Sequence, residues 1–211
     1  MKSILRGTIV GMLVAMCWTA MLGQDNAMSA KPKSSKPAPP AMQMPKPAPE
    51  MTKLIKMMSG SWMVTEKADP SPMMPKGGTG KGTAKLTVGP GGMSMMENYH
   101  SSGMMGGNFS GVGTFWWDPK VQAYRGVWCD SMTPAGCDGS GTTKWEGDNL
   151  VGIMEGEMNG QKMTTKFTYS NWTANSFVMT MASGPDANSL KPMMTITYTK
   201  AAPAKAEKPT P

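Results

Sequence analysis

The chain has 211 residues and a formal net charge of +7, which is enough length for one domain of ordinary size with tails. The charge first suggests a nucleic-acid partner, but residues 51–200 contain 13 basic and 11 acidic residues, so most of the excess lies near the two ends. Nucleic-acid binders cluster Lys and Arg on the folded surface, whereas Arg125 is the sole arginine of that span. We therefore expect no nucleic-acid partner.

Residues 1–27 have the layout of a secretory signal peptide. Lys2 and Arg6 precede an apolar stretch over residues 7–22, and small and polar residues follow it. We expect cleavage near Ala27, export to the periplasm or the medium, and no stable membrane anchor afterwards. A retained anchor is the alternative, but the apolar run is short for a membrane span.

The segments on either side of the predicted domain have the composition of tails. Residues 28–50 are mostly Lys, Pro, Ala, Ser and Met without a hydrophobic period, and residues 201–211 repeat that character. Both are predicted to be disordered. Residues 51–58 predict two turns of helix that end at Ser59, so the folded domain is expected over residues 51–200.

Beyond this helix the pattern is that of β-strands. Short runs rich in Thr, Val, aromatic residues and Met are separated by Gly, Asn, Asp and Pro about every ten residues. Asn159-Gly160 is a strong hairpin signal, because a type I′ turn needs positive φ at both central positions. The ten predicted strands cover residues 61–67, 80–88, 93–101, 108–117, 123–130, 141–146, 149–158, 162–170, 176–183 and 193–200.

Ten strands joined in sequence predict an all-β, antiparallel up-and-down barrel. Closure into a barrel removes the exposed edges of so long a meander, and an open sandwich is the main alternative. Several glycines lie within predicted strands, where glycine usually marks a bulge or a sharp bend. They are Gly111, Gly113, Gly126, Gly152 and Gly156.

The stretch from Gly111 to Cys137 is the densest part of the chain, with three of the seven tryptophans and two of the three cysteines. Asp118-Pro119 suits the start of a type I turn, so we interpret the stretch as a hairpin. Signal cleavage would remove Cys17 and leave Cys129 and Cys137, which an exported chain most simply joins in a disulfide. Two separate thiols are the alternative, and the ligand spacing for a metal site is poor.

Several short motifs together resemble a bacterial family catalogued as a domain of unknown function, number fifteen seventy-nine. They are Gly60-Ser61-Trp62, Gly91-Gly92, the segment from Gly111 to Asp118, Tyr124 and Trp128-Cys129-Asp130. Met93 departs from the pattern, since the family often has Arg there. The resemblance implies a lipocalin-like (calycin-like) barrel that holds a small apolar ligand.

Aromatic side chains are the candidates for lining such a ligand. Alternation places Phe109, Phe115 and Trp117 on one face of their strand and Trp116 on the other. Packing of the core or plugging of a barrel end is the alternative role. Asp118 and Asp130 are expected to accept hydrogen bonds in turns rather than to act as acids. The candidate ligand-binding residues are Trp62, Phe115, Trp117, Tyr124 and Trp128.

The 26 methionines raise a second hypothesis, because thioether sulfur is a soft donor suited to Cu(I). Methionine also fills ordinary core positions in place of Leu or Ile, which is the alternative reading. His100 is also the one residue that would suggest haem, and nothing else in the sequence supports that cofactor. The candidate metal ligands are Met93, Met95, His100, Met104 and Met105.

No catalytic motif accompanies these residues. His100 stands beside Ser101-Ser102, but no nucleophile elbow is present. The leading hypothesis is therefore an exported, non-catalytic protein that binds a small hydrophobic ligand and needs no cofactor. The alternative hypothesis is Cu(I) binding or redox buffering by methionine in the periplasm.

Overall fold

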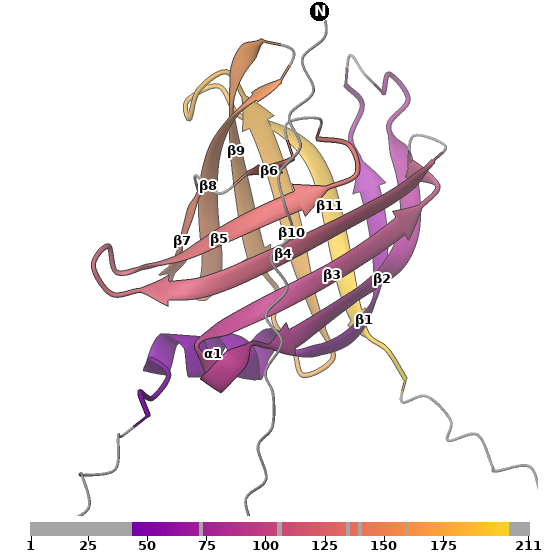
Figure 1. The fold of residues 1–211 in the computed structure, drawn as a ribbon. Coiled ribbons are helices and arrows are strands. Elements are labelled where there is room, and N and C mark those ends of the chain that lie inside the picture. The colour runs from indigo at the N-terminus through magenta and orange to yellow at the C-terminus, as the bar shows by residue number, and fades with distance from the viewer. Residues whose placement is uncertain are drawn as a thin grey trace, which may run out of the picture. The chain divides into compact units, whose positions relative to one another are not determined.

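The computed structural model describes residues 44–202, apart from residues 72, 73, 105, 106, 134, 135, 139, 140 and 159 (Figure 1). The predicted signal peptide lies outside the described residues, as do the predicted tails before residue 44 and after residue 202. Within the described residues, no helix is long and apolar enough to cross a membrane.

Ten antiparallel strands form a closed ring (Figure 1). Neighbours in the chain are neighbours in the ring, β1 pairs with β11, and β4 pairs with β5, so the sheet closes on itself. The ring consists of β1 (Gly60–Ala68), β2 (Gly78–Val88), β3 (Ser94–Ser102), β4 (Asn108–Asp118), β5 (Ala123–Asp130), β7 (Thr142–Glu146), β8 (Asn149–Met158), β9 (Gln161–Ser170), β10 (Ser176–Gly184) and β11 (Lys191–Lys200).

This closure confirms the predicted up-and-down barrel and excludes the sandwich. Each predicted strand agrees with an observed one to within two residues at either end. The sequence did not predict β6 (Cys137–Asp138), which pairs with the C-terminal part of β5, or the short 3-10 turn η1 (Pro90–Gly92). Both are too short for a periodic pattern to show.

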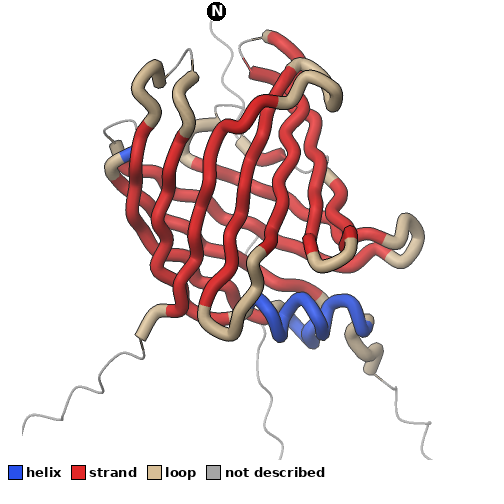
Figure 2. Tube along the Cα trace, turned by 180° about the vertical axis from the view of Figure 1, so that it is seen from behind, coloured by secondary structure: helices blue, strands red, loops and turns tan. Residues whose placement is uncertain are grey.

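Helix α1 (Pro49–Met58) covers one end of the barrel, as Figure 2 shows. Its buried side is made of Met51, Leu54 and Met58, which recur at helical spacing. Pro49 at its first turn has the fixed φ that suits a helix start. We call this covered end the α1 end and the opposite end the far end.

Aromatic rings fill the barrel at the α1 end. The ring of Phe177 stacks on Tyr198 at 4.3 Å between centroids and meets the edge of Trp62 at 4.8 Å. The Trp62 indole N–H donates a hydrogen bond of 2.8 Å to the carbonyl of Met58, which ties the barrel interior to the end of α1. This half of the barrel is a packed core.

The glycines inside strands provide room for aromatic rings. The pairing of β4 with β5 keeps a continuous register at Gly111 and Gly113, so these two glycines mark no bulge. A Cβ added at Gly111 would lie 2.2 Å from Cζ2 of Trp128, and one at Gly152 would lie 2.1 Å from Cε2 of Phe167. Glycine at these sites therefore lets each indole or phenyl ring lie directly against the neighbouring strand.

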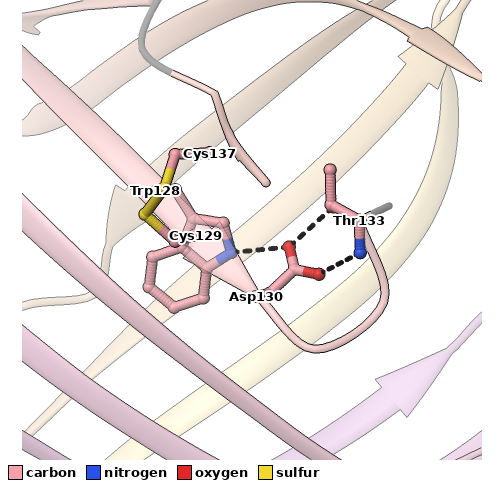
Figure 3. The surroundings of a disulfide bond; sticks show 5 residues. All are labelled: Trp128, Cys129, Asp130, Thr133 and Cys137. Carbon is pink, nitrogen blue, oxygen red and sulfur yellow. Dashed lines mark hydrogen bonds between the residues drawn. A yellow bond between two sulfur atoms is a disulfide. The ribbon is translucent and has the colours of Figure 1, made fainter. Parts of the chain in front are cut away.

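The predicted disulfide between Cys129 and Cys137 is present (Figure 3). It joins β5 to β6, where the two cysteines are also paired in the sheet, and their Cα atoms are 4.1 Å apart. The bond spans a sequence separation of 8 residues. It therefore fixes the segment that follows β5 to the C-terminal part of β5.

Replacing Cys129 and Cys137 with serine should lower the free energy of unfolding by about 2 to 3 kcal/mol, because the closed loop is short. Urea denaturation of the oxidised wild type and the double variant measures the difference. A reducing agent should destabilise the wild type by the same amount and leave the variant unchanged. Equal stability of the two oxidised proteins would contradict the expectation.

Candidate functional site

Two carboxylates occupy inward positions of the barrel. Along β1, Glu66 continues the inward series of Trp62 and Val64, and on β3 Glu97 lies between the inward residues Met95 and Tyr99. Glu66 is 6% exposed and Glu97 is 4% exposed. Acidic side chains are rarely buried to this degree, so their position demands partners.

Tyrosine hydroxyls provide most of those partners. The hydroxyl of Tyr99 donates to Oε1 of Glu66 at 2.5 Å, and the hydroxyl of Tyr198 donates to Oε1 of Glu97 at 3.3 Å. Tyr169 is buried nearby, and the charge of Glu97 raises the pKa of its hydroxyl. We call Glu66, Glu97, Tyr99, Tyr169 and Tyr198 the carboxylate–tyrosine cluster.

Oε2 of Glu66 has no partner within the part of the chain that the structure describes. Among the described residues, Oε2 of Glu66 is the buried side-chain oxygen that makes no hydrogen bond. Gly80 stands opposite Glu66 in the pairing of β1 with β2, and a Cβ at Gly80 would lie 2.1 Å from that oxygen. The carboxylate therefore occupies space that only glycine leaves free.

Burial governs the protonation of the cluster. Loss of solvation raises the pKa of Glu97 from its ordinary 4.5 to about 7, although the hydrogen bond from Tyr198 lowers it. Burial also raises the pKa of Tyr99, Tyr169 and Tyr198 above their ordinary value, and the nearby carboxylates add to the effect. The tyrosines therefore remain neutral hydrogen-bond donors at any physiological pH.

No cation of the chain neutralises these carboxylates within the described residues. The single ion pair found there joins Arg125 to Asp118 at 2.8 Å, outside the cluster. The described part of the chain also contains no group of three or more His, Cys, Asp or Glu side chains placed to hold a metal ion. The cluster can thus accept hydrogen bonds from, or attract positive charge on, a group from outside the chain.

Apolar side chains surround the cluster on the inner wall. The ring of Tyr99 meets the edges of Phe109 at 6.0 Å and of Trp128 at 6.3 Å. These two residues, together with Met179 and Met194, pack against the buried core but are only partly buried themselves. The inner surface therefore combines a polar centre with an aromatic and thioether wall.

The five predicted ligand-binding residues all belong to the barrel core, but the structure divides them. Trp62 and Tyr124 are buried at the α1 end, where the Tyr124 hydroxyl donates to the carbonyl of Glu50 at 2.8 Å. Trp117 contacts the edge of Tyr124 at 5.1 Å between centroids, and Phe115 lies over Gly126. Trp128 is the member that lies beside the carboxylate–tyrosine cluster.

The orientation of Trp128 is set by Asp130 (Figure 3). The indole N–H donates to Oδ2 of Asp130 at 3.0 Å, while Oδ1 accepts from the backbone N–H groups of Met132 and Thr133. Asp118 likewise accepts from the backbone N–H of Lys120 at 2.9 Å. The predicted roles of the two aspartates as hydrogen-bond acceptors in turns are confirmed, and Trp116 is on the outer face as predicted, 37% exposed.

The predicted metal ligands are not brought together. Met95 is fully buried inside the barrel, whereas His100 is exposed on the opposite face of β3. Met93 follows η1 at the α1 end, and Met104 lies beyond the other end of β3. Met105 lies outside the described residues.

Sequence reasoning missed Glu66, Glu97 and the tyrosines that hold them. A signal was present, since Trp62-x-Val64-x-Glu66 and Met95-x-Glu97-x-Tyr99 place a carboxylate in phase with apolar residues. An acidic residue in the inward series of a strand predicts a polar site inside the barrel.

A closed antiparallel barrel with one end covered by a short helix and a polar cluster inside defines the class of lipocalin-like barrels. The chain belongs to the family described as "Protein of unknown function (DUF1579)", whose model matches residues 46–200. This membership confirms the resemblance that the sequence motifs indicate. A search of curated protein sequences finds no match.

Solved structures with the same architecture share little sequence with this chain. Rv2717c from M. tuberculosis is similar with a TM-score of 0.51 and 11% identity, over 74% of this chain and 100% of that one. The S-type phycobiliprotein lyase CPES from Guillardia theta also gives a TM-score of 0.51, with 9% identity, over 72% of this chain and 92% of the lyase. At such identity the likeness shows the fold alone.

Proposed function

We propose that the protein binds a small, mostly apolar molecule inside the barrel without converting it. Glu66 receives a hydrogen-bond donor or a positive charge of that molecule. The signal peptide predicted for residues 1–27 supports a role in the periplasm or outside the cell. Within the described residues, the interior offers hydrogen-bonding and apolar groups, and both can contact a ligand.

The observation that carries this proposal is the unpartnered Oε2 of Glu66. A buried carboxylate oxygen without a hydrogen bond costs free energy of several kcal/mol, and native proteins satisfy such groups with water, an ion or a ligand. A donor group on a bound molecule removes that cost. The binding free energy therefore gains from pairing Oε2 of Glu66, which is unsatisfied when no ligand is bound.

The apolar wall supports the same proposal. Phe109, Trp128, Met179 and Met194 face the interior of a closed barrel, yet each is only partly buried. Solvent reaches an inward side chain only from a barrel end or through a gap in the wall. Contact with a ligand body would bury this remaining apolar surface, at about 25 cal/mol per Å².

A fluorescent probe tests the proposal. N-phenyl-1-naphthylamine is uncharged, has an aromatic body and carries one N–H donor. We expect saturable binding to the wild type, and binding weakened about fivefold to tenfold by Glu66→Gln, because a charged acceptor becomes a neutral one. Fluorescence titration gives both dissociation constants.

The control is Glu146→Gln, which changes an exposed glutamate on β7 and should leave the affinity within about twofold. Glu66→Gln should not destabilise the fold, because it removes a buried charge that lacks one partner. Absence of saturable binding, or equal affinity of Glu66→Gln and wild type, would refute the proposed function.

A further inference from the structure

A pocket of about 350 Å³ lies outside the barrel interior, at the α1 end. It lies between the side of α1, the loop that joins β9 to β10, and the end of β11. Its volume is at the small end of the range for small-molecule sites. The lining includes Lys53, Lys56, Met57, Trp172, Thr173 and Lys200, and we call it the basic pocket.

Two of its three ammonium groups are held in position. Nζ of Lys53 lies 3.6 Å from the centroid of the Trp145 ring, so its charge rests on an aromatic face. Nζ of Lys200 lies 4.8 Å from the centroid of the Trp62 ring and donates to the carbonyl of Ser59 at 3.3 Å. These contacts restrain both ammonium groups, on neighbouring residues that do not themselves line the pocket.

Among the described residues, no carboxylate lies within ion-pair distance of the lysines of the basic pocket. In the part of the chain that the structure describes, the single ion pair within 4.0 Å is that of Arg125 with Asp118. Three lysines therefore line one pocket without a carboxylate at ion-pair distance among the described residues, and their positive charges would attract an anion. The pocket is partly open to solvent, so salt will screen this attraction.

Trp172 gives the basic pocket a rigid apolar wall. Its indole N–H donates to the carbonyl of Asp148 at 2.9 Å, and its ring stacks on Phe177 at 5.1 Å. The indole is only partly buried, and the partly buried Met57 lies beside it in the lining. The accessible part of the indole therefore offers an apolar surface in the same pocket as the lysines.

We infer that the basic pocket is a second binding site, which takes a small anion with a flat aromatic body and a sulfonate, carboxylate or phosphate group. It is separate from the site inside the barrel and does not depend on the proposed function. The three lysines recognise the charge, and Trp172 recognises the ring.

The test uses 8-anilino-1-naphthalenesulfonate, which is the probe named above with a sulfonate added. Fluorescence titration of the full chain at low ionic strength should give saturable binding. The triple variant K53Q/K56Q/K200Q should bind about tenfold more weakly, because each exposed charge contributes a modest amount. Added salt should weaken the wild type more than the triple variant.

Matched controls locate the effect. K81Q/K85Q/K120Q removes three exposed lysines elsewhere and should change the affinity less than about twofold. Replacing the three pocket lysines with arginine keeps the charge and should retain binding. Glu66→Gln should leave the affinity for the sulfonate unchanged, which separates this site from the barrel interior.

Three results would overturn the inference. They are absence of saturable binding by the wild type, an equal loss in the two triple glutamine variants, and a triple variant that binds as the wild type does. If the arginine variant does not fold, its loss of binding does not count, and the salt dependence of binding by the triple glutamine variant decides the test. A salt dependence equal to that of the wild type would also overturn it.

Discussion

Trp62→Ala is expected to lower the free energy of unfolding by about 4 kcal/mol, within the range of about 3 to 5 kcal/mol that truncation of buried Phe or Trp typically costs. Trp62 is 1% exposed and meets the edge of Phe177 at 4.8 Å. Its loss leaves a large void, because the surrounding strands are held in a closed ring and cannot collapse into it.

A second contribution comes from the end of the helix. The indole N–H of Trp62 donates to the carbonyl of Met58, the last residue of α1, and the variant leaves that carbonyl without this donor. We therefore expect α1 to loosen from the barrel before the sheet unfolds. Hydrogen exchange of the amides of α1 would detect this loosening in the variant.

Trp116→Ala is the matched control, because it removes the same kind of side chain from the outer face of β4. Trp116 is 37% exposed, and we expect its removal to cost no more than about 1 kcal/mol. Urea denaturation followed by far-UV circular dichroism compares the two variants without relying on tryptophan emission. Equal costs at the two positions would contradict the assignment of Trp62 to the core.

The second large effect is a fall in stability as the pH rises from about 4.5 to about 7. Burial raises the pKa of Glu97 to about 7 in the folded protein, whereas its ordinary value of 4.5 applies to the unfolded chain. Between these values the folded state binds one more proton than the unfolded state, so the free energy of unfolding decreases as the pH rises. The total decrease from this group is about 3 kcal/mol.

Glu97→Gln tests this effect, because glutamine has the shape of the protonated acid and never ionises. At pH 5 the variant should be more stable than the wild type by no more than about 1 kcal/mol. At pH 8 the variant should be more stable by about 3 kcal/mol. Other titrating groups cancel in this comparison, since both proteins carry them.

Glu146→Gln serves as the control, since this exposed glutamate should not change the pH dependence. Urea denaturation at pH 5, 6, 7 and 8 gives the free energy of unfolding of each protein. Two results would contradict the raised pKa of Glu97. They are a free energy of unfolding of the wild type that does not fall over this pH range, and a Glu97→Gln variant whose free energy of unfolding falls as steeply as that of the wild type.

Much of the fold was predictable because its signals are local. The alternation of inward and outward residues, as at Phe115, Trp116 and Trp117, depends only on strand geometry. Turn chemistry at Asp118 and Asp130 depends on backbone groups two or three residues away. The predicted strands agree with the structure to within two residues at every strand end.

The candidate site was not predictable in this way. Tyr99 bonds Glu66 across 33 residues, and Tyr198 bonds Glu97 across 101 residues. The role of glycine was also misread, since Gly111 and Gly113 make room for the Trp128 ring rather than for a bulge. Such contacts depend on which strand faces which across the barrel, and no pattern along one strand contains that information.

By itself, therefore, the sequence determined the strands, the short helix, the family and the pair of cysteines that bond, because periodicity, turn residues and composition act over short distances. Only the tertiary structure decided that two carboxylates share the barrel interior with three tyrosines. It also decided that Lys53, Lys56 and Lys200 line one pocket. Closing the ring brings these residues together, and closure is a property of all the strands at once.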